Sequence, residues 1–255
     1  MKICKYVSND EIKFGAIKDN MIFPLDNISD IEKNAENFSL ENPVSFSEVE
    51  FLPPVIPTKI VCVGRNYAAH AAELGNEVPK EPLLFLKAPS ALIVDGDDIV
   101  IPDQSEQIEH EGELALIIGR ECAKLTENDD PFEYVFGYLC LNDVTARDVQ
   151  RKDIQFTRGK SFDTFCPISS FIETELDVSD VRVTTKVNGE IRQDGRTSQM
   201  VFPIDFLIRY ISNQMTLKAG DIIATGTPSG VSKMVGGDVC EVEIEGIGIL
   251  RNTVK

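Results

Sequence analysis

Short apolar runs rich in β-branched residues recur along this chain and limit the folds that it can adopt. Examples are IVCVG at 60–64, ELALIIG at 113–119 and VCEVEIEG at 239–246. Helical periodicity is clearest in two stretches, 68–74 and 203–214. Because strand patterns outnumber helical ones, we expect an α+β fold, mostly β, built around a rolled or barrel-like sheet.

The first fifty residues have a different pattern and predict a small module of their own. KICKYV, IKFGAI and MIFPL are short alternating pieces separated by Asn/Asp turns, and an acidic segment expected as a short helix or loop follows them. Pro53, Pro54 and Pro57 then stiffen an extended linker. The predicted domains are a β-rich N-terminal module at 1–52 and a larger domain at 53–255.

Composition argues against several classes of partner. The formal charge of −17 opposes binding to nucleic acid or to an anionic membrane. No apolar run approaches the roughly 20 residues of a membrane span, and the N-terminus lacks an apolar signal core. The six cysteines are scattered without a CxxC pair, which predicts reduced thiols. We expect a cytoplasmic protein without nucleic-acid or membrane partners.

One motif, QIEHEGELALIIG, combines negative charge with an apolar strand. Glu111 and Glu113 would share a strand face, and Asp143 ends another apolar run, GYLCLN. Such carboxylates are either solvated or neutralised by a cation, and three oxygen ligands would suit Mg²⁺ or Mn²⁺. Zinc is disfavoured because the chain has two histidines and no HExxH. Glu109, ahead of the apolar run, is expected in solvent.

His70 and Glu73 form a second candidate pair. They are three residues apart in a helical pattern, so their side chains face the same side. A carboxylate beside an imidazole raises its basicity, as a general base near neutral pH requires. The alternative is an ordinary exposed helix pair. Cys62 or Cys166 paired with His70 as a nucleophile is a weaker option.

Basic and polar residues follow Asp143 and suggest an anion site. Arg147, Gln150 and Lys160 belong to a stretch whose cations either balance surface charge or attract an anionic substrate. The loop DIIATGTPSG, which contains Thr227, offers amides and hydroxyls to a carboxylate or oxyanion.

Six motifs together resemble the fumarylacetoacetate hydrolase superfamily: VGRNYAAHAAELG, EHEGELALIIG, GYLCLNDVTARDVQ, GKSFDTFCP, VNGEIRQDGRTSQMVF and GDIIATGTPSGV. They occur in the family's order over roughly residues 55 to 255. The chain is most similar to the smaller acylpyruvate hydrolase, oxaloacetate decarboxylase and hydroxyheptadienedioate isomerase branch. The resemblance implies a β-roll catalytic domain of the fumarylacetoacetate hydrolase type, bound Mg²⁺ or Mn²⁺, and a homodimer.

The resemblance also implies a role for each candidate residue. It makes three carboxylates the metal ligands, Glu111, Glu113 and Asp143. Lys160 lies beside the metal, and the substrate contacts are Arg147, Gln150 and Thr227. His70 and Glu73 form a dyad on a lid that activates water.

We therefore expect a divalent-metal-dependent hydrolase that cleaves a C–C bond in a small acylpyruvate, a 2,4-dioxo acid, through an enolate that the metal stabilises. Aromatic catabolism is the expected setting. Oxaloacetate decarboxylation or tautomerisation, and isomerisation of 2-hydroxyhepta-2,4-diene-1,7-dioate, would use a similar enolate and stay open. In each case the partner is a small anionic 2-oxo acid. A metal-binding scaffold that has lost catalysis is the non-enzyme alternative.

Overall fold

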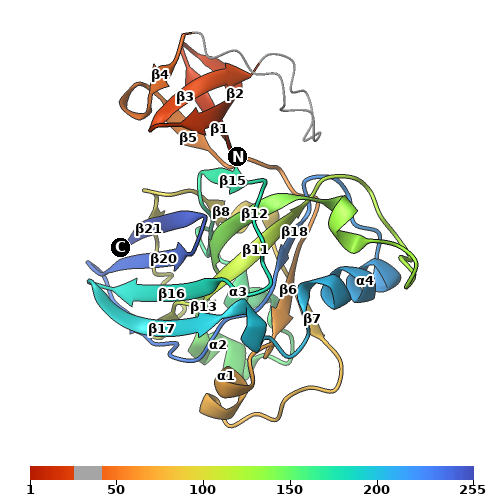
Figure 1. The fold of residues 1–255 in the computed structure, drawn as a ribbon. Helices are drawn as coiled ribbons and strands as arrows, with labels where there is room; N and C mark the ends of the chain where they lie inside the picture. The colour runs from red at the N-terminus through yellow and green to blue at the C-terminus, as the bar shows by residue number, and fades with distance from the viewer. Residues whose placement is uncertain (26–41) are drawn as a thin grey trace.

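The computed structural model describes residues 1–25 and 42–255. The acidic segment expected as a helix or loop lies outside the described residues. Strands dominate the described part of the chain (Figure 1), which confirms the expected α+β, mostly β fold. Among the described residues, no helix is both long enough and apolar enough to cross a lipid bilayer.

An 11-stranded sheet runs through the molecule and carries most of the core. Its spatial order is β4 (Val44–Ser45), β3 (Met21–Leu25), β2 (Glu11–Lys18), β1 (Lys2–Ser8), β15 (Phe171–Glu173), β12 (Val135–Asn142), β11 (Gly112–Ile118), β18 (Ile222–Ala224), β6 (Ile60–Gly64) and β7 (Leu83–Lys87), with β5 (Glu50–Leu52) beside β1.

Smaller sheets and short helices complete the fold. A 5-stranded sheet has the order β17 (Glu190–Arg196), β16 (Arg182–Val187), β20 (Val239–Ile244), β21 (Gly248–Val254) and β9 (Asp98–Ile99). A 3-stranded sheet contains β13 (Thr145–Ala146), β10 (Ile108–Glu109) and β19 (Lys233–Met234), and β14 (Cys166–Pro167) pairs with β8 (Leu92–Ile93). The α-helices are α1 (Ala68–Glu73), α2 (Arg147–Lys152), α3 (Thr157–Lys160) and α4 (Ile204–Gln214).

Two of these helices, α1 and α4, confirm the helical stretches expected from the sequence. Apolar residues of α4 recur at the spacing of one helix face, and they are buried at Ile204, Leu207, Ile208 and Ile211. The sequence pattern did not reveal helices α2 and α3, and α3, at four residues, spans barely one turn.

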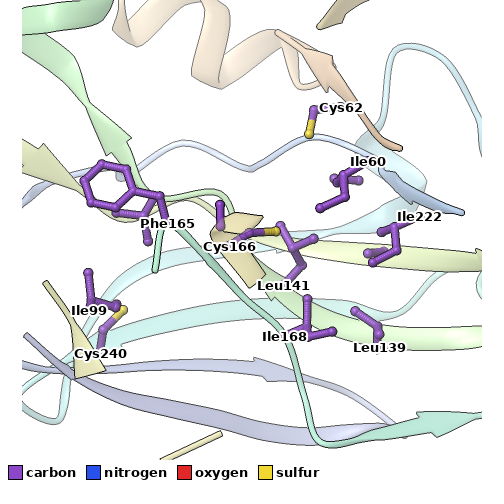
Figure 2. Packing of buried hydrophobic residues seen from close by; sticks show 14 of the residues in the cluster. Ile60, Cys62, Ile99, Leu139, Leu141, Phe165, Cys166, Ile168, Ile222 and Cys240 are labelled. Atoms are coloured by element: carbon purple, nitrogen blue, oxygen red, sulfur yellow. The ribbon is translucent and has the colours of Figure 1, made fainter. Parts of the chain in front are cut away.

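The central strands are buried on both faces. Ile60, Cys62 and Ile222 point into one apolar cluster together with side chains of β12 and β14 (Figure 2). Val61 and Ile223, their neighbours along the strands, point into a second cluster that α4 covers. This alternation follows from the two-residue period of a strand. Side chains at the ends of these strands therefore lie next to packed apolar side chains.

The N-terminal strands extend the main sheet. Strand β1 pairs with β15, and the Met1 amino group forms an ion pair with Glu173. The module packs its own small apolar cluster around Cys4, Tyr6 and Ile22. It forms the end of the molecule that lies away from α1 (Figure 1). The domain boundary after residue 52 stays a prediction.

Gly112 is expected to be a critical packing position. A Cβ atom there would collide with Oγ1 of the buried, β-branched Thr185 and would lie 3.2 Å from Cγ1 of Val242. Overpacking of this kind costs about 1–3 kcal/mol, so Gly112→Ala should lower the free energy of unfolding by that amount in urea titration. Gly236→Ala is the control, because its Cβ would meet nothing within 4 Å. Equal stability of the two variants would contradict the prediction.

Candidate active site

The antiparallel pair β11–β12 brings three acidic side chains together. Gly112 pairs with Asn142, so the adjacent residues Glu111 and Asp143 lie opposite each other. The backbone N–H of Asp143 donates to the Glu111 carbonyl at 2.8 Å. Ligand oxygens of Glu111, Glu113 and Asp143 lie within 4.8 Å of one another. All three side chains are buried. We call these three residues the acidic cluster.

Two buried lysines neutralise part of the acidic cluster. Lys160, at the end of α3, places its ammonium 2.7 Å from Glu111 Oε2 and 2.6 Å from Asp143 Oδ2. Burial alone would lower the pKa of Lys160, but attraction to Asp143 and Glu111 outweighs it, so the pKa is raised and the ammonium stays charged. Lys87 lies 2.6 Å from Asp143 Oδ1. Sequence reasoning missed Lys87, whose only signal was a lysine at the end of the apolar run LLFLK.

The expectation that Glu109 is in solvent is wrong. Glu109 is only 6% exposed, and its Oε2 accepts a hydrogen bond of 2.7 Å from Arg147 Nε. Glu109 belongs to β10, which leaves the line of β11 and pairs with β13 directly ahead of Arg147. Because the strand is interrupted between β10 and β11, a two-residue sequence period does not predict this arrangement.

Arg147 is a buried bridge rather than a surface charge. Besides Glu109, its guanidinium pairs with Glu111 through Nη2 and donates to Gln150 Oε1 from Nη1 at 2.5 Å. Arg147 and Gln150 are thus brought together beside the acidic cluster, as the sequence suggested.

Glu113 is the least compensated member of the acidic cluster. Within the part of the chain that the structure describes, its hydrogen bond comes from the Gly226 N–H at 2.8 Å. Burial raises the pKa of Glu113, and repulsion by Asp143 and Glu111 raises it further. Burial also acts on Glu111, but Lys160 and Arg147 outweigh it and lower the pKa of that carboxyl. One carboxylate is thereby left without a cation.

This charge balance fits a divalent metal ion. Among the described residues, the buried group contains four carboxylates, the acidic cluster and Glu109, against three cations, Arg147, Lys160 and Lys87. Carboxylate oxygens are the ligands that Mg²⁺ and Mn²⁺ prefer. A cation held by the acidic cluster would offset the repulsion that raises the pKa of Glu113.

Helix α1 carries the candidate base into the same pocket. His70 is buried, and its Nδ1 lies 3.5 Å from Glu73 Oε2. The geometry is not that of a hydrogen bond, because Nδ1 has no such partner among the described residues, while the Glu73 carboxylate accepts the Gly230 N–H at 3.1 Å. Burial lowers the pKa of His70. The imidazole is therefore neutral at pH 7 and able to accept a proton.

A cavity of about 280 Å³ connects these groups. The predicted site residues that line it are His70, Glu111, Glu113, Asp143, Arg147, Gln150, Lys160 and Thr227. The Thr227 hydroxyl donates to the Gly112 carbonyl and accepts from Gln193, so both groups orient it. Helices α1, α2 and α3 all contribute to the wall, together with residues that sequence reasoning did not single out, Arg65, Asn76, Phe85 and Phe156 among them.

The cysteines are poor candidates for a nucleophile. All six are free and buried, which confirms that they are thiols without disulfides. Burial raises the pKa of Cys62, and it raises the pKa of Cys166 to about 12. Because the thiolate is the reactive form, these side chains are unreactive at neutral pH.

Similarities to known proteins indicate the family of this chain. Residues 59–255 match the family model described as fumarylacetoacetate (FAA) hydrolase C-terminal. An oxaloacetate tautomerase of Bos taurus is 43% identical over 77% of this chain and 91% of its own length. An oxaloacetate decarboxylase of Dictyostelium discoideum is 45% identical over 74% of this chain and 89% of its own length.

The fold agrees with these relatives. The crystal structure of 2-hydroxyhepta-2,4-diene-1,7-dioate isomerase from Mycobacterium marinum superposes with a TM-score of 0.85 at 34% identity, covering 100% of this chain and 98% of that one. The match includes the N-terminal strands as well as the region that resembled the family in sequence. The chain belongs to the fumarylacetoacetate hydrolase family.

Proposed function

We propose that this protein interconverts the keto and enol forms of a small 2-oxo dicarboxylic acid such as oxaloacetate, with Mg²⁺ or Mn²⁺ held by the acidic cluster. The observation that carries the proposal is the meeting, in one pocket, of three oxygen ligands, a protonated lysine and a neutral imidazole. The oxaloacetate activities of two relatives support this substrate class.

The metal would be held by Glu111, Glu113 and Asp143, because these oxygens converge and no described residue forms an ion pair with Glu113. A divalent ion bound there supplies Lewis-acid stabilisation to negative charge on substrate oxygens, an effect worth several kcal/mol. Lys87 and Arg147 would not bind the metal themselves. They hold the carboxylates of Asp143 and Glu111, respectively, in place through hydrogen bonds.

The reaction needs one proton transfer from carbon. His70 removes a proton from C3 of the substrate, the C–H electron pair forms the C2=C3 double bond, and the C2=O electrons move onto oxygen. The Lys160 ammonium stabilises the resulting negative charge. A proton from solvent on that oxygen gives the enol, and His70 releases its own proton to solvent; the reverse sequence gives the keto acid. Decarboxylation would reach an enolate by loss of CO₂ instead of the proton.

Hydrolysis of an acylpyruvate is the second candidate. The observation in its favour is the carboxylate of Glu73 beside the neutral His70, an arrangement that can take a proton from water. In that reaction water attacks the distal carbonyl and the C–C bond breaks to leave the enolate of pyruvate.

Turnover of oxaloacetate by the purified chain tests the proposal. We expect Mg²⁺ or Mn²⁺ to accelerate the decay of the enol absorbance in freshly dissolved oxaloacetate, and EDTA to abolish that effect. Pyruvate formed from oxaloacetate would indicate decarboxylation, and pyruvate formed from acetylpyruvate would indicate hydrolysis. A protein that binds the metal but turns over none of these compounds would contradict the proposal and favour a scaffold.

Glu113→Gln should separate metal binding from folding. The change keeps the shape of the side chain but removes the charge of a metal ligand. Mutating a residue that only holds a ligand in place lowers metal affinity by about 10–100-fold, so Mg²⁺ affinity in calorimetry should fall by more than about 100-fold here. In EDTA the same variant should melt at a higher temperature than wild type, because it removes a poorly compensated buried charge. Glu190→Gln, at an exposed carboxylate, should change neither property. Unaltered Mg²⁺ affinity in Glu113→Gln would sink the ligand assignment.

His70→Gln should retain Mg²⁺ affinity and lower kcat by about 10²–10⁴-fold, the usual contribution of a general base. Because burial lowers the pKa of His70, the wild-type kcat/KM should hold down to pH 6.5, the ordinary pKa of imidazole, and fall only below it. Glu73→Gln is the matched variant and should lose less activity, since its carboxylate is not hydrogen-bonded to the ring. Lost Mg²⁺ binding in His70→Gln would contradict the role of a base.

A further inference from the structure

The pocket is lined by four cationic side chains, and one of them has no partner among the described residues. Arg147 and Lys160 pair with buried carboxylates, and Arg151 donates to Gln107 at 3.3 Å. Arg65 also lines the pocket, half-buried, yet no described residue gives its guanidinium a hydrogen bond or an ion pair. A guanidinium without such contacts is available to bind an anion.

The backbone holds Arg65 at a fixed place despite a conformational cost. Its φ is +59°, in the left-handed region that residues with a Cβ rarely adopt. The next residue, Asn66, is fully buried and donates its side-chain amide to the Thr225 carbonyl at 2.8 Å, while its Oδ1 accepts from the Phe202 N–H at 2.8 Å. Strain that surrounding contacts enforce is typical of functional positions.

The charges in the pocket indicate which group of the substrate Arg65 would balance. Four buried carboxylates against three cations leave one negative charge, and a divalent metal ion converts this to one positive charge. That charge offsets one carboxylate of the substrate. A second carboxylate in the same enclosed pocket would need another cation, because an unpaired charge is costly to desolvate.

We propose that Arg65 binds the second carboxylate of the substrate and so makes the pocket selective for 2-oxo dicarboxylates over 2-oxo monocarboxylates. This inference rests on the proposed function, since it takes a 2-oxo acid as the ligand of the pocket. Arg65 is then a residue that determines specificity, and the proton transfer itself does not need it.

The test is a binding measurement on two compounds that lack a C3 proton. In saturating Mg²⁺, calorimetry should give wild type an affinity for 3,3-difluorooxaloacetate about 10–100-fold higher than for its 4-methyl ester, as expected for a charged hydrogen-bonded pair. Arg65→Gly should lose this preference by binding the dicarboxylate more weakly while its affinity for the ester stays unchanged. Its melting temperature should not fall, because glycine adopts the left-handed conformation readily.

Lys124→Gly is the matched control. Lys124 is exposed, has a φ of +56° and does not line the pocket, so this variant removes a similar charge and a similar strain and should keep the preference. A preference that survives in Arg65→Gly, or its absence in wild type, overturns the inference. Turnover of oxaloacetate is measured separately: wild type that prefers the difluorinated dicarboxylate but does not turn over oxaloacetate would reject the proposed function and leave the role of Arg65 standing.

Discussion

Mutual compensation of buried charge is the constraint on which this site depends. The ammonium of Lys160 donates to both Glu111 and Asp143, at 2.7 and 2.6 Å, so each of these buried side chains has a cationic partner. The penalty for burying one such carboxylate alone is several kcal/mol, and the attraction of a buried pair offsets it only with good geometry. Removing one partner would leave a charge without compensation. The four carboxylates and three cations therefore act as one group with one excess negative charge.

The topology of the sheets supplies that geometry. Strands β11 and β12 pair along their length, which places Glu111 beside Asp143, and β10 turns away to bring Glu109 to Arg147. The central strands are packed on both faces, so the backbone that carries the acidic cluster is held between two apolar clusters. Gly112 permits the close approach of β11 to Thr185 of the second sheet. The positions of the three acidic side chains are thus set by the packing of the sheets.

The parts of this arrangement that the sequence could predict are local. The alternation of Glu111 and Glu113 ahead of an apolar strand indicated a charged face next to a buried one, and the spacing of His70 and Glu73 placed both on one side of a helix. The pairings of Glu109 with Arg147 and of Lys87 with Asp143 span 38 and 56 residues, so no periodicity reports them. Periodicity does not report the left-handed backbone of Arg65 either, because this conformation depends on the tertiary contacts of the next residue, Asn66.

The cations that pair with the acidic cluster also oppose protonation of His70. A histidine near several carboxylates would ordinarily gain a proton, because negative charge favours the imidazolium form. For His70, burial is the largest influence and lowers its pKa; Glu111 and Glu73 raise it, while Arg147 and Lys160 lower it further. The positive charges therefore oppose the pull of the carboxylates on His70. A pocket lined by several carboxylates can in this way retain a neutral imidazole, the form of the ring that can accept a proton.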